Sequence, residues 1–157
     1  MWFPPLGSHV QPAPRRVPEH WIPDYRQPLT LDVVVGAQAD RFPATSLARF
    51  FDQPYRLSAQ TDRMGARLDG PALTVMGERL ISEGISLGAI QVTTDGQPII
   101  LLNDRQTIGG YPKLGAVTPR SLDALAQRPP GTELRFRAIS LHDAQLRERA
   151  FLQFFTR

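Results

Sequence analysis

Hydrophobic and polar residues alternate along several short stretches of the chain, which is the pattern of β-strands with one buried face. The segment 29–35 (LTLDVVV) has this character, and so do the segments 55–60 and 132–139. In the last two segments the alternation assigns Ala59 and Ala138 to the same faces as the larger apolar side chains. We therefore predict strands in these three segments.

Two more strands are predicted on either side of the turn TTDG, over residues 89–92 (AIQV) and 98–102 (PIILL). The second is apolar on both faces, as expected of a fully buried strand. The stretch 61–98 contains six glycines, so its strands are expected to be short and joined by tight turns. The pair Glu83-Gly84 is interpreted either as one such turn or as an acid placed near the site.

Three helices are predicted, the first from apolar residues at helical spacing and the other two also from capping signals. One begins at Ala44, inside PATSLARFFDQ. A second spans 118–127, where a Thr-Pro pair suits a helix start. A third follows Ser140 and Asp143, which resemble a capping box, and runs to residue 155. Many short strands with two or three helices indicate a mainly-β fold, and periodicity does not choose between a barrel and a sandwich.

The first 28 residues contain seven of the fifteen prolines, which excludes a regular helix or a central strand there. We predict an arm or linker over 1–28 and a globular domain over 29–157. Aromatic residues in the arm (Trp2, Phe3, Trp21 and Tyr25) favour docking on another surface, with a disordered tail as the alternative.

Composition removes several classes of function. The chain has 157 residues, a net charge of +3 and no cysteine, so it forms one domain without disulfides or thiol chemistry. Lys113 is the only lysine, and the arginines are scattered rather than clustered, so we expect no nucleic-acid partner. No stretch approaches a membrane span and no secretory signal opens the chain, so we expect a cytoplasmic protein.

The segment 101–115 (LLNDRQTIGGYPKLG) is the richest in candidate chemistry. An apolar strand leads into Asn103, Asp104, Arg105 and Gln106, which face alternate sides while the chain stays extended. The glycine pair 109–110 then either lets backbone approach a ligand or supplies positive φ. The structural alternative is an Asp104–Arg105 network that pins the loop and leaves Lys113 in solvent.

Other motifs are weaker. Ser86 lies in G-x-S-x-G, with Asp104 and His142 following in hydrolase order, but the residues after it are β-like where a nucleophile elbow needs a helix. Neither a phosphate-binding loop nor G-x-G-x-x-G is present. The three histidines share no ligand spacing, so we expect no metal site in this chain.

The runs TDRMGARLDGP, EGISLGAIQV and GQPIILLNDRQTIGGYPKLG, between Thr61 and Gly115, resemble the C-terminal half of a family called 5-oxoprolinase C-subunit, allophanate hydrolase subunit 2 or biotin-dependent carboxyltransferase. The resemblance implies a cyclophilin-like β-barrel. It further implies that the N-terminal half of the family fold is missing and that the arm is its remnant. Thr93-Thr94 and Ile108 depart from the family pattern, where a proline and a threonine are expected.

The resemblance also implies a function and a site. The function is ATP-dependent opening of 5-oxoproline to glutamate, or a related amide hydrolysis or carboxyl transfer, in a complex with a B-subunit and, for an oxoprolinase, an A-subunit as well. ATP belongs to the assembled complex, and the chain alone is expected to be inactive. The catalytic candidates are Asp104, Arg105 and Lys113. The candidates for binding a small-molecule substrate are Arg63, Met64, Glu83, Gln91, Gln106 and Tyr111. The alternative is a regulatory protein that antagonises a kinase-inhibitor-like partner.

Overall fold

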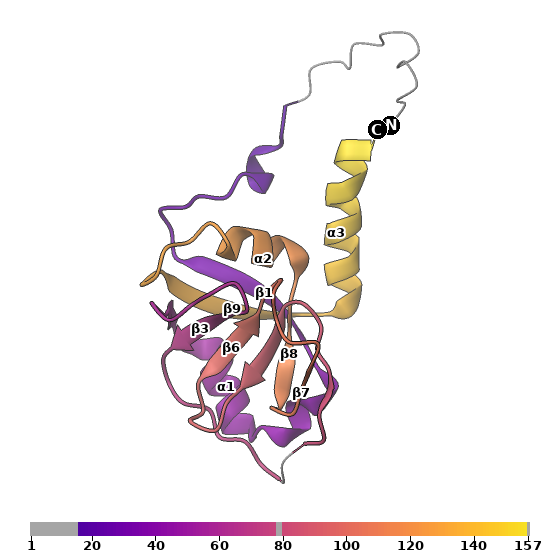
Figure 1. Ribbon diagram of the computed structural model, residues 1–157. Coiled ribbons are helices and arrows are strands. Elements are labelled where there is room, and N and C mark those ends of the chain that lie inside the picture. The colour runs from indigo at the N-terminus through magenta and orange to yellow at the C-terminus, as the bar shows by residue number, and fades with distance from the viewer. Residues whose placement is uncertain (1–15, 78–79, 157) are drawn as a thin grey trace, which may run out of the picture.

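A computed structural model describes residues 16–77 and 80–156 of the chain (Figure 1). Seven strands close into a barrel in the order β1-β8-β5-β6-β3-β2-β9, and β4 and β7 form a separate two-stranded sheet within the part described. The barrel strands are β1 (Leu29–Val35), β2 (Tyr55–Leu57), β3 (Gly65–Asp69), β5 (Ala89–Val92), β6 (Pro98–Leu101), β8 (Lys113–Val117) and β9 (Glu133–Ile139). The outer pair is β4 (Glu83–Gly84) and β7 (Ile108–Gly109). The mainly-β prediction is confirmed, and the closed sheet shows that the fold is a barrel rather than a sandwich.

The helices are α1 (Ala44–Asp52), α2 (Pro119–Leu125) and α3 (Leu141–Thr156), with short 3-10 turns η1 (Glu19–Trp21) and η2 (Ala37–Arg41). Helix α1 begins at Ala44 as predicted and inserts Phe50 into the core, where its ring stacks on that of Phe136 at 4.2 Å between centroids. Helix α2 packs against β1. Helix α3 projects away from the barrel beside the N-terminal arm (Figure 1).

The barrel interior is filled by apolar side chains from alternate positions of every long strand. The side chains with no exposed surface are Leu31, Val33, Tyr55, Ile90, Ile100, Leu114 and Leu134 from the strands and Phe50 from α1. The parallel pairing of β9 with β1, from Leu29↔Leu134 to Val34↔Ile139, closes the barrel. This pairing joins segments about a hundred residues apart, which local periodicity does not reveal.

Two predicted inward residues prove to be exposed. Strand β2 ends at Leu57 because the chain then turns, with Thr61 donating its backbone N–H to the carbonyl of Ser58 at 3.2 Å; Ser58 is buried and Ala59 faces solvent. On β9, Ala138 is exposed because β2 pairs only with the start of that strand, opposite Leu134. The far end of β9 keeps β1 as its neighbour but has no β2 beside it.

The predicted strand 98–102 and the predicted turn at Glu83-Gly84 also need correction. Strand β6 ends at Leu101, and Ile99 and Leu101 on its outer face are only half-buried. It is β5 that is buried on both faces, because β4 and β7 lie over it. Glu83 and Gly84 form a short strand opposite Gly109 and Ile108, rather than a turn.

The two predicted helix caps, at Ser140 and Thr118, differ in outcome. Ser140 accepts the N–H of Asp143 at 3.0 Å, so Ser140 caps α3 as predicted. The Asp143 carboxylate accepts the Ser140 hydroxyl at 2.7 Å, rather than the backbone N–H that a capping box uses. Thr118 precedes α2 but directs its hydroxyl to Ser121 rather than to a backbone N–H. Helix α2 ends at Leu125, two residues earlier than predicted.

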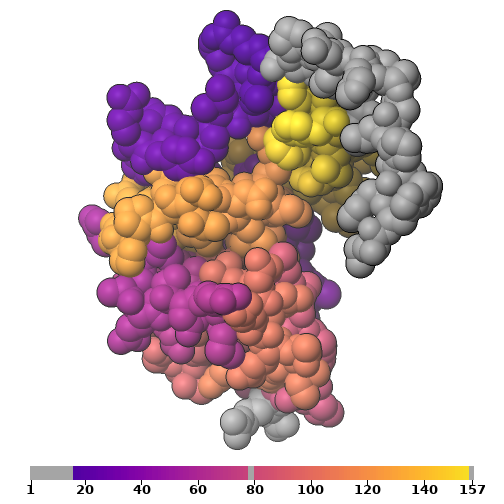
Figure 2. All heavy atoms as spheres, turned by 45° about the horizontal axis from the view of Figure 1, so that its top comes forward, coloured from indigo at the N-terminus to yellow at the C-terminus, as the bar shows by residue number. Residues whose placement is uncertain are grey.

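Residues 16–28 of the arm dock on the folded domain, as the aromatic residues suggested. Trp21 packs edge-on against Phe151 at 5.4 Å and Phe154 at 5.0 Å, both on α3. Figure 2 shows this part of the arm, in indigo, beside the yellow helix. The backbone carbonyl of Tyr25 accepts a hydrogen bond from Arg128. Trp2 and Phe3 lie outside the described residues. The boundary between arm and domain stays a prediction.

Across 16–77 and 80–156, no helix is both long enough and apolar enough to cross a membrane.

Candidate functional site

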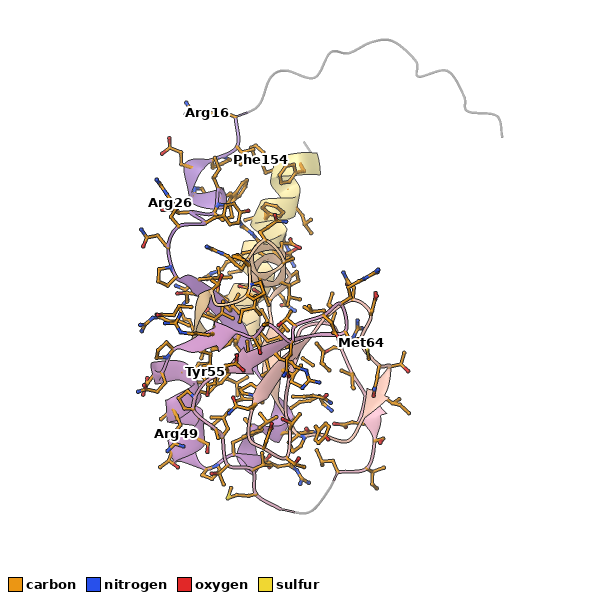
Figure 3. All side chains as sticks on the ribbon, turned by 60° about the vertical axis from the view of Figure 1, so that its left-hand side comes forward. Arg16, Arg26, Arg49, Tyr55, Met64 and Phe154 are labelled. Atoms are coloured by element: carbon orange, nitrogen blue, oxygen red, sulfur yellow. The ribbon has the colours of Figure 1, made fainter. Side chains whose placement is uncertain are left out.

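A cavity of about 630 Å³ lies on the outer face of the barrel, above β3, β5 and β6 and beneath the β4–β7 sheet. Its walls bring together five of the predicted site residues, namely Met64, Gln91, Arg105, Gln106 and Tyr111. In Figure 3, Met64 lies on the side of the barrel where the two-stranded sheet is found. The outward-facing Ile99 and Leu101 of β6 form part of its floor.

Gln91 supplies the most buried polar group of this cavity. Its side chain is only 7% exposed, and its Nε2 has no hydrogen-bond partner among the described residues. A buried amide without a partner costs free energy, so such a group is expected to meet a ligand or an ordered water. The Nε2 of Gln91 is therefore a hydrogen-bond donor available to a ligand at the inner end of the cavity.

Gly109 explains how a strand can lie so close to Gln91. A Cβ atom at this position would lie 2.7 Å from Cδ1 of Ile85 and 3.1 Å from Nε2 of Gln91. The absence of a side chain lets β7 cross directly over the amide. Of the two roles considered for the glycine pair, positive φ is not observed, because the positive-φ glycines of the described chain are Gly77, Gly88, Gly96 and Gly131. Close approach to a ligand stays a prediction.

Arg105 is fixed by backbone carbonyls rather than by an acid. Its Nε donates to the carbonyl of Ile85 at 3.2 Å, and its Nη1 donates to that of Leu102 at 3.3 Å. No carboxylate in the described part of the chain pairs with it. Since a guanidinium has five N–H donors, Arg105 keeps donors and its full charge for an anionic group in the cavity.

Asp104 does not join Arg105. The chain stops being extended after Leu101 and turns, with Arg105 donating its N–H to Leu102, so the expected alternation over 103–106 is absent. Asp104 pairs instead with Arg63, at 2.9 Å between Oδ2 and Nε. This salt bridge is exposed and lies outside the cavity lining. The Asp104–Arg105 network that was considered as an alternative is therefore wrong.

Lys113 and Glu83 meet in a neighbouring groove, also of about 630 Å³, between β1, β8 and α3. The ammonium of Lys113 pairs with the carboxylate of Glu83, and the side-chain amide of Gln38 donates to the same carboxylate. The hydrogen bonds from Lys113 and Gln38 lower the pKa of Glu83. Lys113 is not left in solvent, because its side chain is only 17% exposed.

The segment 82–86 separates the cavity from the groove. Ser82 and Ile85 line the cavity, whereas Glu83 and Ser86 line the groove. The strand that follows Ser86 is β5, from Ala89, so no nucleophile elbow forms there. Gln38 was missed from the sequence, because it reaches this cluster from 75 residues away and no local motif marks it.

No group of three His, Asp or Glu side chains suited to a metal ion occurs in the described ranges.

Comparison with known proteins identifies the class. Residues 5–138 match the family model "Carboxyltransferase domain, subdomain A and B". This chain belongs to that family.

Individual relatives refine the placement. The chain is 40% identical to the 5-oxoprolinase C-subunit of Escherichia coli (strain K12) over 110 residues, covering 69% of this chain and 36% of that protein. It is 31% identical to urea amidolyase of Lachancea kluyveri over 132 residues, covering 76% of this chain and 7% of that protein. The chain thus spans about a third of the length of the 5-oxoprolinase relative.

Solved structures agree on the fold. The K. lactis urea amidolyase superposes with a TM-score of 0.74 at 24% identity, over 82% of this chain and 8% of that chain. The Kluyveromyces lactis urea carboxylase gives 0.70 at 25% identity, over 74% and 11%.

Proposed function

We propose that this protein is a subunit of an ATP-dependent amide hydrolase of the 5-oxoprolinase type, which opens 5-oxoproline to glutamate. Membership of the carboxyltransferase family and 40% identity to a 5-oxoprolinase C-subunit support this interpretation. The observation that carries it is that two side chains line the same cavity: Gln91, whose amide Nε2 has no hydrogen-bond partner, and Arg105, whose guanidinium pairs with no carboxylate of the described residues.

The substrate offers the groups that these two residues lack. 5-Oxoproline has one lactam carbonyl and one carboxylate. The Gln91 Nε2 would donate to the lactam oxygen, and Arg105 would bind the carboxylate through its remaining N–H donors. A hydrogen bond to the carbonyl oxygen draws charge from the amide carbon and makes it easier for a nucleophile to attack.

Gln106 and Tyr111 also line the cavity and stay candidates for substrate contact. Arg63, Asp104, Glu83 and Lys113 lie outside its lining, so their parts in the reaction are proposed to be indirect or to depend on a partner surface.

ATP is a poor fit to the described residues. Gly109 belongs to strand β7 and packs over Gln91, rather than opening a phosphate-binding loop before a helix. The ammonium of Lys113 is engaged by Glu83. We therefore assign ATP to the assembled complex of this chain with a B-subunit and an A-subunit, in the cytoplasm.

The test is reconstitution. The chain is mixed with the candidate partner subunits of both types, and ATP hydrolysis that depends on 5-oxoproline is measured together with glutamate formation. We expect turnover in the mixture and none from this chain alone. Robust turnover by the chain alone would contradict the assignment of ATP to the complex. ATP turnover unaffected by 5-oxoproline would contradict the proposed substrate.

A regulatory role is the competing outcome. In that case this chain would bind a kinase-inhibitor-like partner and relieve its inhibition of the kinase. Arg105→Met would leave that relief unchanged, because no reaction would occur in the cavity.

A further inference from the structure

Three charged side chains line the cavity beneath the β4–β7 sheet, namely Asp62, Arg67 and Arg105. Among the described residues, no ion pair joins the Asp62 carboxylate to either guanidinium. A ligand with two anionic groups and one cationic group would be complementary to this set of charges. A lactam acid has one anionic group and no cationic group, so it matches only part of the lining.

The strand register places Arg67 opposite Gln91 across β6. Ile99 of β6 pairs with Gln91 on one side and with Arg67 on the other. Residues paired in this way point to the same face of a sheet, so all three side chains lie on the outer face. Two strand spacings separate the Cα atoms of Gln91 and Arg67 by roughly 10 Å, a gap that a small ligand can span over Ile99.

The guanidinium of Arg67 is available to such a ligand. Arg67 is exposed, and its guanidinium forms no hydrogen bond or ion pair with another described residue. Asp95 interacts with it electrostatically, but hydrogen bonds from Thr93 and from the backbone of Gln97 do more to lower the pKa of Asp95. Arg67 therefore keeps its N–H donors for an anionic group in the cavity.

Asp62 is held near Arg105 by the backbone. Its Oδ1 accepts the N–H groups of Met64 at 2.8 Å and Gly65 at 3.0 Å, which fixes the carboxylate. Leu102 joins the two turns, because its N–H donates to the carbonyl of Met64 and its own carbonyl accepts from Arg105. The Oδ2 of Asp62 accepts no hydrogen bond from a described residue, so it can accept one from a cationic group.

Opening a lactam acid produces the charges that this lining would bind. In net terms the lactam C–N bond breaks and a C–O bond to the oxygen of water forms. The nitrogen keeps its electron pair and receives both hydrogens of the water, so it becomes an ammonium group, and the carbonyl becomes a carboxylate. ATP in the assembled complex supplies the free energy. The opened product therefore carries two carboxylates and one ammonium group.

We infer that the cavity binds this opened product, a zwitterionic amino dicarboxylate, as well as the lactam. The inference rests on the proposed function, from which it takes glutamate as the ligand. The carboxylate that both forms share stays at Arg105. The new carboxylate lies between Arg67 and Gln91, which held the lactam oxygen. The new ammonium group meets Asp62.

Calorimetric titration of the full chain tests this assignment. The probes are glutamate, norvaline, glutarate and 5-oxoproline. Norvaline has the carbon chain of glutamate without the second carboxylate, and glutarate has it without the ammonium group. We expect glutamate to bind about 10-fold more tightly than norvaline or glutarate, the lower end of the effect of a charged hydrogen bond. The lower end applies because Asp62 and Arg67 are exposed.

Two variants locate the preference. Arg67→Met should bind glutamate no better than norvaline, and Asp62→Asn should bind it no better than glutarate. The affinity of Arg67→Met for 5-oxoproline should be unchanged, because the lactam lacks the new carboxylate. Asparagine keeps an Oδ1 for the N–H groups of Met64 and Gly65, so the turn is retained.

The matched controls are Arg56→Met and Asp69→Asn. These two residues are a cross-strand pair of β2 and β3, and both are exposed and line neither the cavity nor the groove. They undergo the same chemical changes as the test residues. Both preferences for glutamate should therefore stay intact.

Three outcomes overturn the inference. Glutamate may bind no more tightly than norvaline or no more tightly than glutarate, either test variant may behave like its control, or no probe may bind the full chain. In each case the reconstituted assay decides separately on lactam opening. Conversely, a glutamate preference that the test variants abolish, without ATP turnover dependent on 5-oxoproline in the complex, would support this inference and contradict the proposed function.

Discussion

The ammonium of Lys113 on β8 is paired with the carboxylate of Glu83 on β4, at the wall between the cavity and the neighbouring groove. Gln38 reinforces the pair, because its Nε2 donates to Glu83 and its Oε1 accepts the backbone N–H of Lys113 at 2.9 Å. These contacts tie β4 to the barrel. Lys113 can therefore influence the cavity through Glu83 without touching a substrate.

The first prediction distinguishes this indirect role from a direct one. If Lys113 acts by holding Glu83, then Lys113→Met and Glu83→Gln should each reduce turnover of the reconstituted enzyme by roughly 10-fold or more, and the double variant should be no worse than either. If Lys113 instead contacts an anionic substrate, only Lys113→Met should be severe. Turnover of all three variants equal to that of the unmodified protein would remove both roles.

The second prediction concerns the unpartnered amide of Gln91. Replacing it by a side chain of similar shape, Gln91→Met, removes a buried donor without leaving another group unpaired. We expect the free energy of unfolding to stay equal or to rise by about 1–3 kcal/mol, while substrate binding is lost. Urea unfolding and calorimetric titration of the same sample measure the two effects.

The matched control is Gln97→Met. Gln97 lines none of the cavities described, and its Nε2 donates to the carbonyl of Gly70 at 3.1 Å. Its Oε1 is buried without a hydrogen-bond partner among the described residues, as the Nε2 of Gln91 is, so Gln97→Met is a control for ligand binding, which should stay intact. A lower stability of Gln91→Met would show instead that water or a neighbouring group satisfies Gln91 in solution.

The third prediction uses Tyr55, whose ring is fully buried in the core and whose hydroxyl donates to the carbonyl of Pro71 at 2.9 Å. Burial raises the pKa of Tyr55 to about 12, and nearby Arg49 opposes the shift. In the unfolded chain this phenol ionises near its ordinary value of about 10. Its contribution to stability is therefore complete below about pH 10 and is lost as the pH rises toward 12.

Tyr55→Phe isolates this effect. At pH 7 the variant should be less stable by about 0.5–1.5 kcal/mol, because the hydrogen bond to Pro71 is gone. The difference should shrink above pH 10 and change sign before pH 12, because two pKa units correspond to about 2–3 kcal/mol of stability lost by the unmodified protein and the variant has no phenol to ionise. Urea unfolding across this range measures it, and a difference that stays constant would contradict the raised pKa.

The fourth prediction concerns the docking of the arm. The ring of Trp21 contacts the rings of Phe151 and Phe154 edge-on. The guanidinium carbon of Arg120 lies 5.7 Å from the centroid of the Trp21 ring. Aromatic pairs of this kind contribute about 0.5–1.5 kcal/mol each beyond the area they bury. Trp21→Ala should release the arm, speed tryptic cleavage after Arg26, and raise binding of a hydrophobic dye to the uncovered face of α3.

Ile22→Ala is the control for this experiment, because its side chain is next in sequence but 59% exposed. It should leave cleavage and dye binding unchanged. Equal cleavage rates for Trp21→Ala and the unmodified protein would mean that the aromatic contacts do not hold the arm.

Local patterns predicted most elements of the fold. Alternating apolar residues located β1 and β9, and the glycine-bounded apolar runs located β5 and β6. Each of these signals depends on neighbours within a few positions, where the pleat of a strand or the spacing of a helix acts directly. Errors arose where pairing ends, at Ala59 and Ala138, because burial there depends on whether a distant strand is present.

For the site, the sequence by itself determined the contiguous region that supplies the cavity, but not which of the candidate residues gather there. Met64, Gln91, Arg105, Gln106 and Tyr111 come from motif runs between residues 61 and 115, and adjacent strands place them together. Only the tertiary structure decided that Asp104 turns away to Arg63 and that Gln38 and Glu83 engage Lys113. The physical reason is that a side chain's partner is fixed by strand register and barrel closure, which bring together residues far apart in the chain.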